Sequence, residues 1–141
     1  MNKLTGAQAR SLIDAALAAA RQQGFKPMGV VVVDAAAQVV ASAREDGATA
    51  LRLDIALGKA AAAVGMGMNS RVLTERAKGL PAFFTGVGQA SQQKFIPQTG
   101  ALLITDAGGM VLGAAGASGG TGDEDEQIVM AGIAAVGLQH A

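Results

Sequence analysis

The sequence has no cysteine, no tryptophan and no tyrosine, and its single histidine, His140, is the penultimate residue. The absence of cysteine excludes disulfides, thiolate nucleophiles and cysteine-bound zinc. A Ser-His-Asp triad is excluded as well unless His140 folds back into the domain, because no other histidine can act as the base. The side chains left for chemistry are therefore carboxylates, lysine and serine.

The chain also lacks an excess of charge of either sign, since 11 basic residues balance 11 acidic ones. Nucleic-acid binding normally requires a basic face and aromatic stacking platforms, and only 3% of the residues are aromatic. No apolar run reaches the ~18 residues of a membrane helix, and the N-terminus has no apolar signal-peptide core. We therefore expect a cytoplasmic protein with neither nucleic acid nor a membrane as partner.

A length of 141 residues predicts one domain that spans residues 1–141. Half of the residues are hydrophobic, so the core must be built mainly from alanine, valine, leucine, isoleucine and methionine. A monomer of this size would expose much alanine- and valine-rich surface, and such surface usually marks an interface. We therefore expect a homo-oligomer.

Hydrophobic periodicity, helix caps and turn residues predict the order of the helices and strands. The expected elements are a helix at 5–23, strands at 28–33 and 38–44, helices at 49–66 and 69–78, a short strand at 95–96, strands at 102–104 and 110–113, and a helix at 123–139. Residues 80–93 are punctuated by proline and glycine and are expected to be irregular. This order predicts an α+β fold, in which helices pack on an antiparallel sheet of four or five strands.

The glycine-rich run at 116–120 ends the last long strand and allows another backbone or a ligand to come close. Thr121 and Glu124 follow with the spacing of a capping box. The four acidic residues at 123–126 then fall in the first turn of a helix, where the helix dipole favours negative charge. We interpret these acids as capping residues and predict no metal site. Ser118 either bonds to the backbone at this helix entrance or acts with Lys59 as a nucleophile.

Lys59 lies in the middle of the apolar segment 49–66, which predicts a largely buried helix. A buried ammonium group must reach solvent, pair with a carboxylate or change its pKa. In a structural role Lys59 would pair with Asp46, Asp54 or Asp125. In a functional role it would bind an anionic ligand or act as an acid–base or Schiff-base lysine. The residues alone leave both roles open.

Two segments, DGATALRLDIALGKAAAA at 46–63 and LGAAGASGGTGDEDEQI at 112–128, resemble the GlcG or HbpS-like family of haem-binding-protein-like domains. The positions that carry the resemblance are Arg44, Asp46, Gly47, Lys59, Ala60, Gly113, Gly116, Ser118, Gly119 and Asp125. The resemblance covers about residues 28–139. It implies a profilin-like fold that forms dimers and higher rings, and it implies Asp125 as the partner of Lys59.

The resemblance also implies a small-ligand-binding domain associated with catabolism, with haem or another organic acid as the ligand. The histidine that ligates haem in relatives is missing here, because His140 is the only one. The candidate ligand-binding residues are Arg44, Lys59, Arg71, Phe83, Phe84, Ser118 and Gly119.

The alternative is a small acid–base enzyme, of the isomerase or hydratase type, that acts on an organic acid. Arg44 or Arg71 would then bind the substrate carboxylate, and Lys59 or Asp125 would move the proton. The two phenylalanines at 83–84 would exclude water from the pocket.

Overall fold

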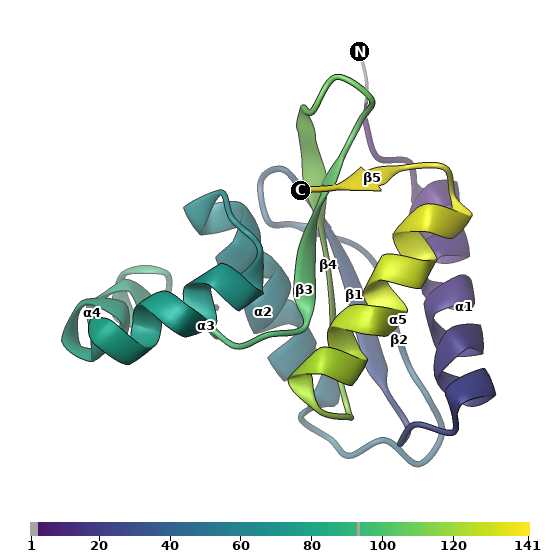
Figure 1. Cartoon of the computed structure of the whole chain (residues 1–141), viewed down its shortest axis with the longest axis horizontal. Helices are drawn as coiled ribbons and strands as arrows, with labels where there is room; N and C mark the ends of the chain where they lie inside the picture. The colour runs from purple at the N-terminus through teal and green to yellow at the C-terminus, as the bar shows by residue number, and fades with distance from the viewer. Residues whose placement is uncertain (1–2, 93) are drawn as a thin grey trace.

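The computed structural model describes residues 3–92 and 94–141, which form five helices and five strands (Figure 1). In chain order these elements are α1 (Gly6–Gln23), β1 (Gly29–Asp34), β2 (Val39–Arg44), α2 (Arg52–Met66), α3 (Ser70–Gly79), α4 (Pro81–Ala90), β3 (Ala101–Thr105), β4 (Val111–Ser118), α5 (Gly122–Ala135) and β5 (Gln139–His140). The strands form one sheet in the order β2-β1-β4-β3-β5, and every neighbouring pair is antiparallel. The predicted α+β architecture is confirmed.

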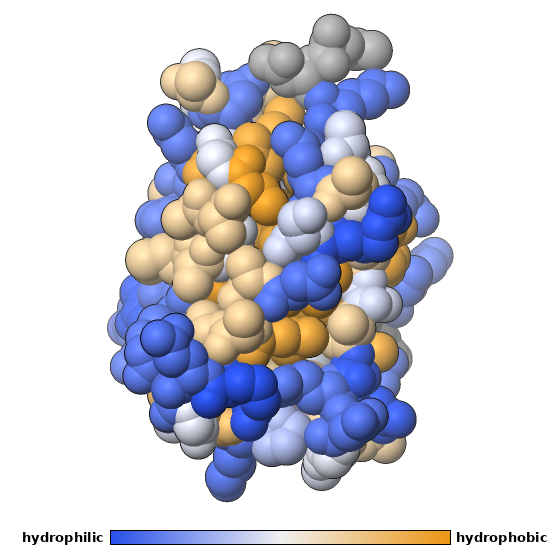
Figure 2. All heavy atoms as spheres, turned by 90° about the vertical axis from the view of Figure 1, so that its right-hand side faces the viewer, coloured by the Kyte–Doolittle hydropathy of each residue, from blue (hydrophilic) through white to orange (hydrophobic). Residues whose placement is uncertain are grey.

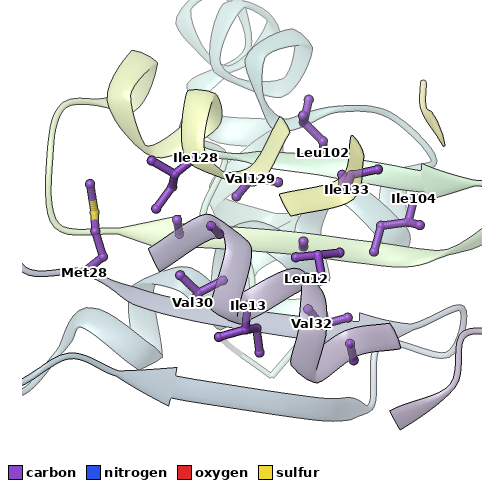
Figure 3. Packing of buried hydrophobic residues seen from close by; sticks show 14 of the residues in the cluster. Leu12, Ile13, Met28, Val30, Val32, Leu102, Ile104, Ile128, Val129 and Ile133 are labelled. Atoms are coloured by element: carbon purple, nitrogen blue, oxygen red, sulfur yellow. The ribbon is translucent and has the colours of Figure 1, made fainter. Parts of the chain in front are cut away.

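The valine run of β1 is buried on both faces of the sheet, as its continuous apolar character predicts. Successive side chains of a strand point to opposite faces. Val30 and Val32 accordingly join the core beneath α1 and α5, whereas Val31 and Val33 pack with the alanines of α2. Figure 3 shows the first of these cores, in which leucine and isoleucine side chains from α1, α5 and the sheet meet.

Helix α2 is buried on two sides because it lies between the sheet and the other helices of its layer. Its Ala56, Ala60 and Ala63 pack on the sheet, and Ala62 packs with Leu73 in a separate cluster beside α3 and α4. Figure 1 shows α3 and α4 extending away from the sheet on this side. The prediction of a largely buried second helix is therefore confirmed.

Three local predictions are wrong. Residues 80–93 were expected to be irregular, but Pro81 begins helix α4, where proline suits the first helical position. Residues 95–96 form no strand. The last helix ends at Ala135 rather than at residue 139, because Gly137 has a φ of 72° and the chain then pairs with β3 as the two-residue strand β5.

Helix α1 begins with a capping box, since the Gln8 N–H donates to Thr5 Oγ1 at 3.0 Å and the Thr5 N–H donates to Gln8 Oε1 at 3.0 Å. Within residues 3–92 and 94–141, no helix is both long and apolar enough to cross a membrane.

Candidate functional site

Lys59 of α2 and Asp125 of α5 form a buried ion pair at the glycine-rich corner. Lys59 Nζ lies 3.0 Å from Asp125 Oδ2 and donates a second hydrogen bond, also of 3.0 Å, to the carbonyl oxygen of Ala117. The other carboxylate oxygen of Asp125 accepts the N–H of Gly120 at 2.9 Å. Lys59 is 5% exposed and Asp125 is 2% exposed. Asp125 is thus the predicted partner, and the pair joins α2 to the end of β4 and the start of α5.

The protonation of Asp125 is governed by opposing effects. Burial raises the pKa of its carboxyl above the usual value, because an ionised carboxylate loses solvation in the interior. The Lys59 ammonium and the Gly120 N–H oppose this rise by stabilising the ionised form. Arg52 adds a weaker opposing charge. Asp125 therefore takes up a proton more readily than an exposed aspartate.

Two glycines let the backbones of this corner approach one another. A Cβ at Gly116 would lie 2.5 Å from the carbonyl oxygen of Ala56 on α2. A Cβ at Gly100, where φ is 137°, would lie 2.7 Å from Lys59 Nζ. The glycine-rich run was expected to let another backbone come close, and α2 does so at Gly116. The ammonium group of Lys59 occupies the space that a side chain at Gly100 would fill.

The acidic run at the start of α5 divides into residues of different character. Thr121 and Glu124 form the predicted capping box, because the Thr121 N–H donates to Glu124 Oε1 at 2.9 Å and the Glu124 N–H donates to Thr121 Oγ1 at 3.2 Å. The side chain of Asp123 is 80% exposed, whereas Asp125 turns inward to Lys59. In the described part of the chain, no three histidine, cysteine or acidic residues form a cluster that suits a metal ion.

Arg52 is a cation of this corner that sequence reasoning missed. It is the first residue of α2 and is partly buried. Its Nη1 donates to Ser118 Oγ at 3.1 Å, and its Nε donates to Thr49 Oγ1 at 3.0 Å. Ser118, 2% exposed, therefore contacts an arginine in place of the lysine that a Ser-Lys nucleophile requires. The available signal was that Arg52 is the one arginine in the apolar segment 49–66.

An open cleft of about 450 Å³ lies over these groups. It is bounded by α2, by the segment before β3, and by the corner between β4 and α5. Its lining residues are Arg52, Ile55, Lys59, Gln98, Thr99, Ser118, Gly120, Thr121, Gly122, Asp123 and Asp125. The cleft thus brings together three of the sequence-predicted candidates, Lys59, Ser118 and Asp125.

Arg71 lies beside the cleft and is already paired. Its guanidinium contacts Asp123, which lines the cleft, and Glu126, with an Nη2–Oε1 distance of 3.1 Å to the latter. Because both partners come from the first turns of α5, Arg71 fastens α3 to that helix. Its charge is largely compensated within the protein.

The remaining candidates lie elsewhere. Arg44 is at the end of β2, in a separate hollow with Arg21 and Glu45. Phe84 stacks on Phe95 with ring centroids 5.9 Å apart, and Phe83 is 55% exposed on α4. The structure therefore does not bring the phenylalanines to the Lys59 cleft.

Gly119 borders a neighbouring hollow of about 480 Å³, which shares Arg52, Gly120 and Thr121 with the cleft. A Cβ at Gly119 would lie 2.4 Å from the carbonyl oxygen of Pro27. The absence of a side chain at Gly119 therefore allows the two backbones to pack closely. The two hollows meet at Arg52.

Residues 4–134 match the family described as haem degrading protein HbpS-like. The chain belongs to this family. The resemblance found in the sequence is thereby confirmed over nearly the whole chain. None of the curated protein sequences matches this chain.

Several solved structures are similar in fold. PduOC, solved as a haem complex, is 26% identical, with a TM-score of 0.86 and coverage of 98% of both chains. A double mutant of HbpS from Streptomyces reticuli is 29% identical, with a TM-score of 0.81 and coverage of 95% of this chain and 87% of that one. The protein ORFY from Klebsiella pneumoniae, 24% identical with a TM-score of 0.86, covers 97% of this chain and 93% of its own, and shows a likeness in fold alone.

Proposed function

We propose that this chain is a small-ligand-binding domain whose ligand occupies the cleft over Arg52 and Lys59. The observation that carries the proposal is the convergence of two cations and a buried hydroxyl, Ser118, on one open cleft. Binding sites commonly combine a concave surface with a few convergent polar groups. Membership of the HbpS-like family and the similarity to PduOC, which was solved as a haem complex, support a ligand-binding role.

The residues of the cleft fit an organic acid but not the ligation of haem iron. Haem iron is usually bound by histidine, methionine, cysteine or tyrosine, and none of these is among the described residues that line the cleft. Met28 is buried in the core, Met66 and Met68 pack beside α3 and α4, and His140 lies on β5. A carboxylate, by contrast, finds both a guanidinium and a hydroxyl at Arg52 and Ser118. We therefore favour an organic acid as the ligand.

Two binding measurements test this function. Small carboxylic acids such as lactate, pyruvate and benzoate should raise the melting temperature in a saturable way, because a ligand that binds only the folded state stabilises it. A haemin titration followed in the Soret band should show no saturable spectral change. If neither the acids nor haemin bind, the proposed function is wrong.

A second candidate function is acid–base catalysis on an organic acid. It is favoured by the Lys59–Asp125 pair, which lines the cleft while burial raises the pKa of Asp125. A carboxyl group whose pKa is raised holds a proton more readily, and such groups are candidates for a general acid or base. Incubation with 2-hydroxy and 2-oxo acids in heavy water, followed by proton NMR, tests for exchange of the C2 hydrogen of the hydroxy acids and of the C3 hydrogens of the oxo acids. Catalysis predicts exchange that is lost in Asp125→Asn.

We further propose that the domain self-associates. Figure 2 shows that apolar surface gathers in a band on the side of the molecule where α1 and α5 lie. Exposed apolar residues of α5 are Met130, Ala131, Ala134 and Ala135. Sedimentation of the purified chain should show a dimer or a larger species at micromolar concentration, and a monomer would contradict this.

The cytoplasmic location and the association with catabolism remain expectations from the sequence.

A further inference from the structure

Among the described residues, Arg52 is a partly buried arginine that no ion pair compensates. Arg21 pairs with Glu45, and Arg71 pairs with Asp123 and Glu126, whereas none of the ion pairs includes Arg52. Its charge acts on Asp125 only from beyond ion-pair distance. Removing a guanidinium from water without a partner is unfavourable, so this position calls for an anion.

The guanidinium of Arg52 is nevertheless held in place. Thr49 Oγ1 accepts its Nε–H, and Ser118 Oγ accepts one N–H of Nη1. A guanidinium has five N–H donors, so three remain without an acceptor in the described protein. Since Arg52 lines both the cleft and the neighbouring hollow, these donors lie at the junction of two open spaces. Fixing the side chain in advance reduces the entropy that ligand binding would lose.

The Ser118 hydroxyl adds a donor at the same place. A serine hydroxyl accepts through its oxygen and donates through its one hydrogen. Ser118 uses its oxygen to accept from Arg52, and no acceptor for its hydrogen is found among the described residues. The side chain is almost fully buried but lines the cleft. Its hydrogen is therefore available to a ligand oxygen beside the guanidinium.

Lys59 is a poorer anchor for a charged group than Arg52. Its charge is already matched by Asp125, and two of its three N–H donors are used by Asp125 and Ala117. The remaining donor suits a neutral ligand oxygen, such as a hydroxyl or a carbonyl. Asp123 and Asp125 line the same cleft, so a second ligand carboxylate would meet like charge.

We propose that Arg52, supported by Ser118, anchors the single carboxylate of a small monocarboxylic acid in the cleft, with Lys59 facing a neutral oxygen of the same ligand. This inference rests on the proposed ligand-binding function and names its ligand class. The planar guanidinium matches a carboxylate through two parallel hydrogen bonds, which a lysine cannot make. A matching dicarboxylate should bind more weakly.

Calorimetric titration of the wild-type protein with lactate, lactamide and malate tests the ligand class without any substitution. Lactate should bind, and lactamide, which has lost the charge, should bind about ten- to a hundredfold more weakly. Malate, with its second carboxylate, should also bind more weakly than lactate. Pyruvate and benzoate serve as further monocarboxylates. Equal affinity for the acid and its amide, or tighter binding of malate, would overturn the inference.

Substitutions then test the anchor. Arg52→Gln should weaken binding of the monocarboxylate by about ten- to a hundredfold, and Arg52→Lys should recover only part of this loss because the fork geometry is missing. Arg76→Gln, which removes an exposed arginine of α3 outside the cleft, is the matched control and should bind as the wild type does. Circular dichroism establishes that each variant is folded.

The outcomes separate the two proposals. Binding of a monocarboxylate that Arg52→Gln leaves within about twofold of wild type overturns the anchor while the ligand-binding function stands. Binding of haemin alone, with no affinity for any of the three monocarboxylates, also overturns the anchor and leaves that function standing. Failure of every probe, haemin included, overturns both.

Discussion

The corner between α2 and α5 and the arm formed by α3 and α4 are stabilised in different ways. In the corner, Lys59 bonds to residues 58 and 66 positions away in the chain, and its contacts are polar and buried. In the arm, Phe84 packs with Leu73 and Phe95 from adjacent segments. The corner thus connects distant segments, whereas the arm depends mainly on neighbours in sequence.

Among the described residues, the hydrogen bonds that attach the arm to β3 come from the start of α3. Ser70 Oγ accepts the N–H of Ala101 at 2.8 Å, and Asn69 Oδ1 accepts the N–H of Leu103 at 2.8 Å, so these side chains cover part of the edge of β3. Beyond this attachment, α4 projects outward (Figure 1). Damage to the corner should therefore lower the stability of the whole domain, whereas the arm should open separately.

The largest effect is expected from Lys59→Ala. This substitution leaves the Asp125 carboxylate buried without its partner, which typically costs about 3–5 kcal/mol. The free energy of unfolding, measured with urea at neutral pH, should fall by that amount. Lys78→Ala is the control, because the Lys78–Glu75 pair is largely exposed and should be worth less than about 1 kcal/mol.

The same variant separates the two roles of Lys59. A folded Lys59→Ala protein of unchanged stability that no longer binds its ligand would assign Lys59 to binding alone and contradict the structural role. Earlier melting with ligand affinity retained in the folded protein would assign it to the corner. The observed pair predicts the loss of stability.

Phe84→Ala should act on the arm. Phe84 is 5% exposed, and truncation of a buried phenylalanine costs about 3 kcal/mol or more. Hydrogen exchange should show this loss in the amides of α4, while the slowest amides of β1 change much less. Phe83→Ala, at an exposed position of the same helix, removes only an edge-to-face contact with Phe84 and should cost α4 no more than about 1.5 kcal/mol. Equal acceleration of β1 and α4 would show that the arm and the sheet open together.

A smaller effect on the corner is expected from Gly116→Ala. The added methyl would lie 2.5 Å from the carbonyl oxygen of Ala56, so α2 must move away, at a cost of about 1–3 kcal/mol. Gly65→Ala on α2 is the contrasting substitution, because its Cβ meets nothing within 4 Å. It should stabilise the protein by up to about 1 kcal/mol, the helix preference for alanine over glycine. The two melting temperatures should therefore shift in opposite directions.

Much of the fold follows from local signals in the sequence. The capping boxes at Thr5 and Thr121 fixed the starts of two helices, and the valine run of β1 indicated a strand with two buried faces. Lys59 in an apolar helix predicted a buried partner, and the family motif indicated Asp125. These features depend on neighbouring residues or on a single long-range pair.

The errors concern residues whose position depends on several distant contacts. Phe83 and Phe84 were expected to exclude water from the ligand pocket, but nothing in the local sequence shows that α4 projects away from the sheet. Arg52 was overlooked because the residue that gives it a role is distant in the sequence. Its significance depends on Ser118, 66 residues later, which meets it only when β4 lies against α2.

The final prediction concerns the pH dependence of the corner. Burial raises the pKa of Asp125 in the folded protein above the usual value, so the folded state binds this proton more tightly than the unfolded chain does. The resulting stabilisation is complete below the unfolded pKa of about 3.9 and is lost as the pH rises through the folded pKa. Its full size is about 1.4 kcal/mol for each pH unit between the two pKa values.

Asp125→Asn lacks this titration but shares the other carboxylates, so the stability of the wild type relative to Asp125→Asn should fall as the pH rises from about 4 toward neutrality. Urea unfolding of both proteins across that range measures the difference. A relative stability that instead increases with pH would show that Lys59 and Arg52 lower the pKa of Asp125 by more than burial raises it.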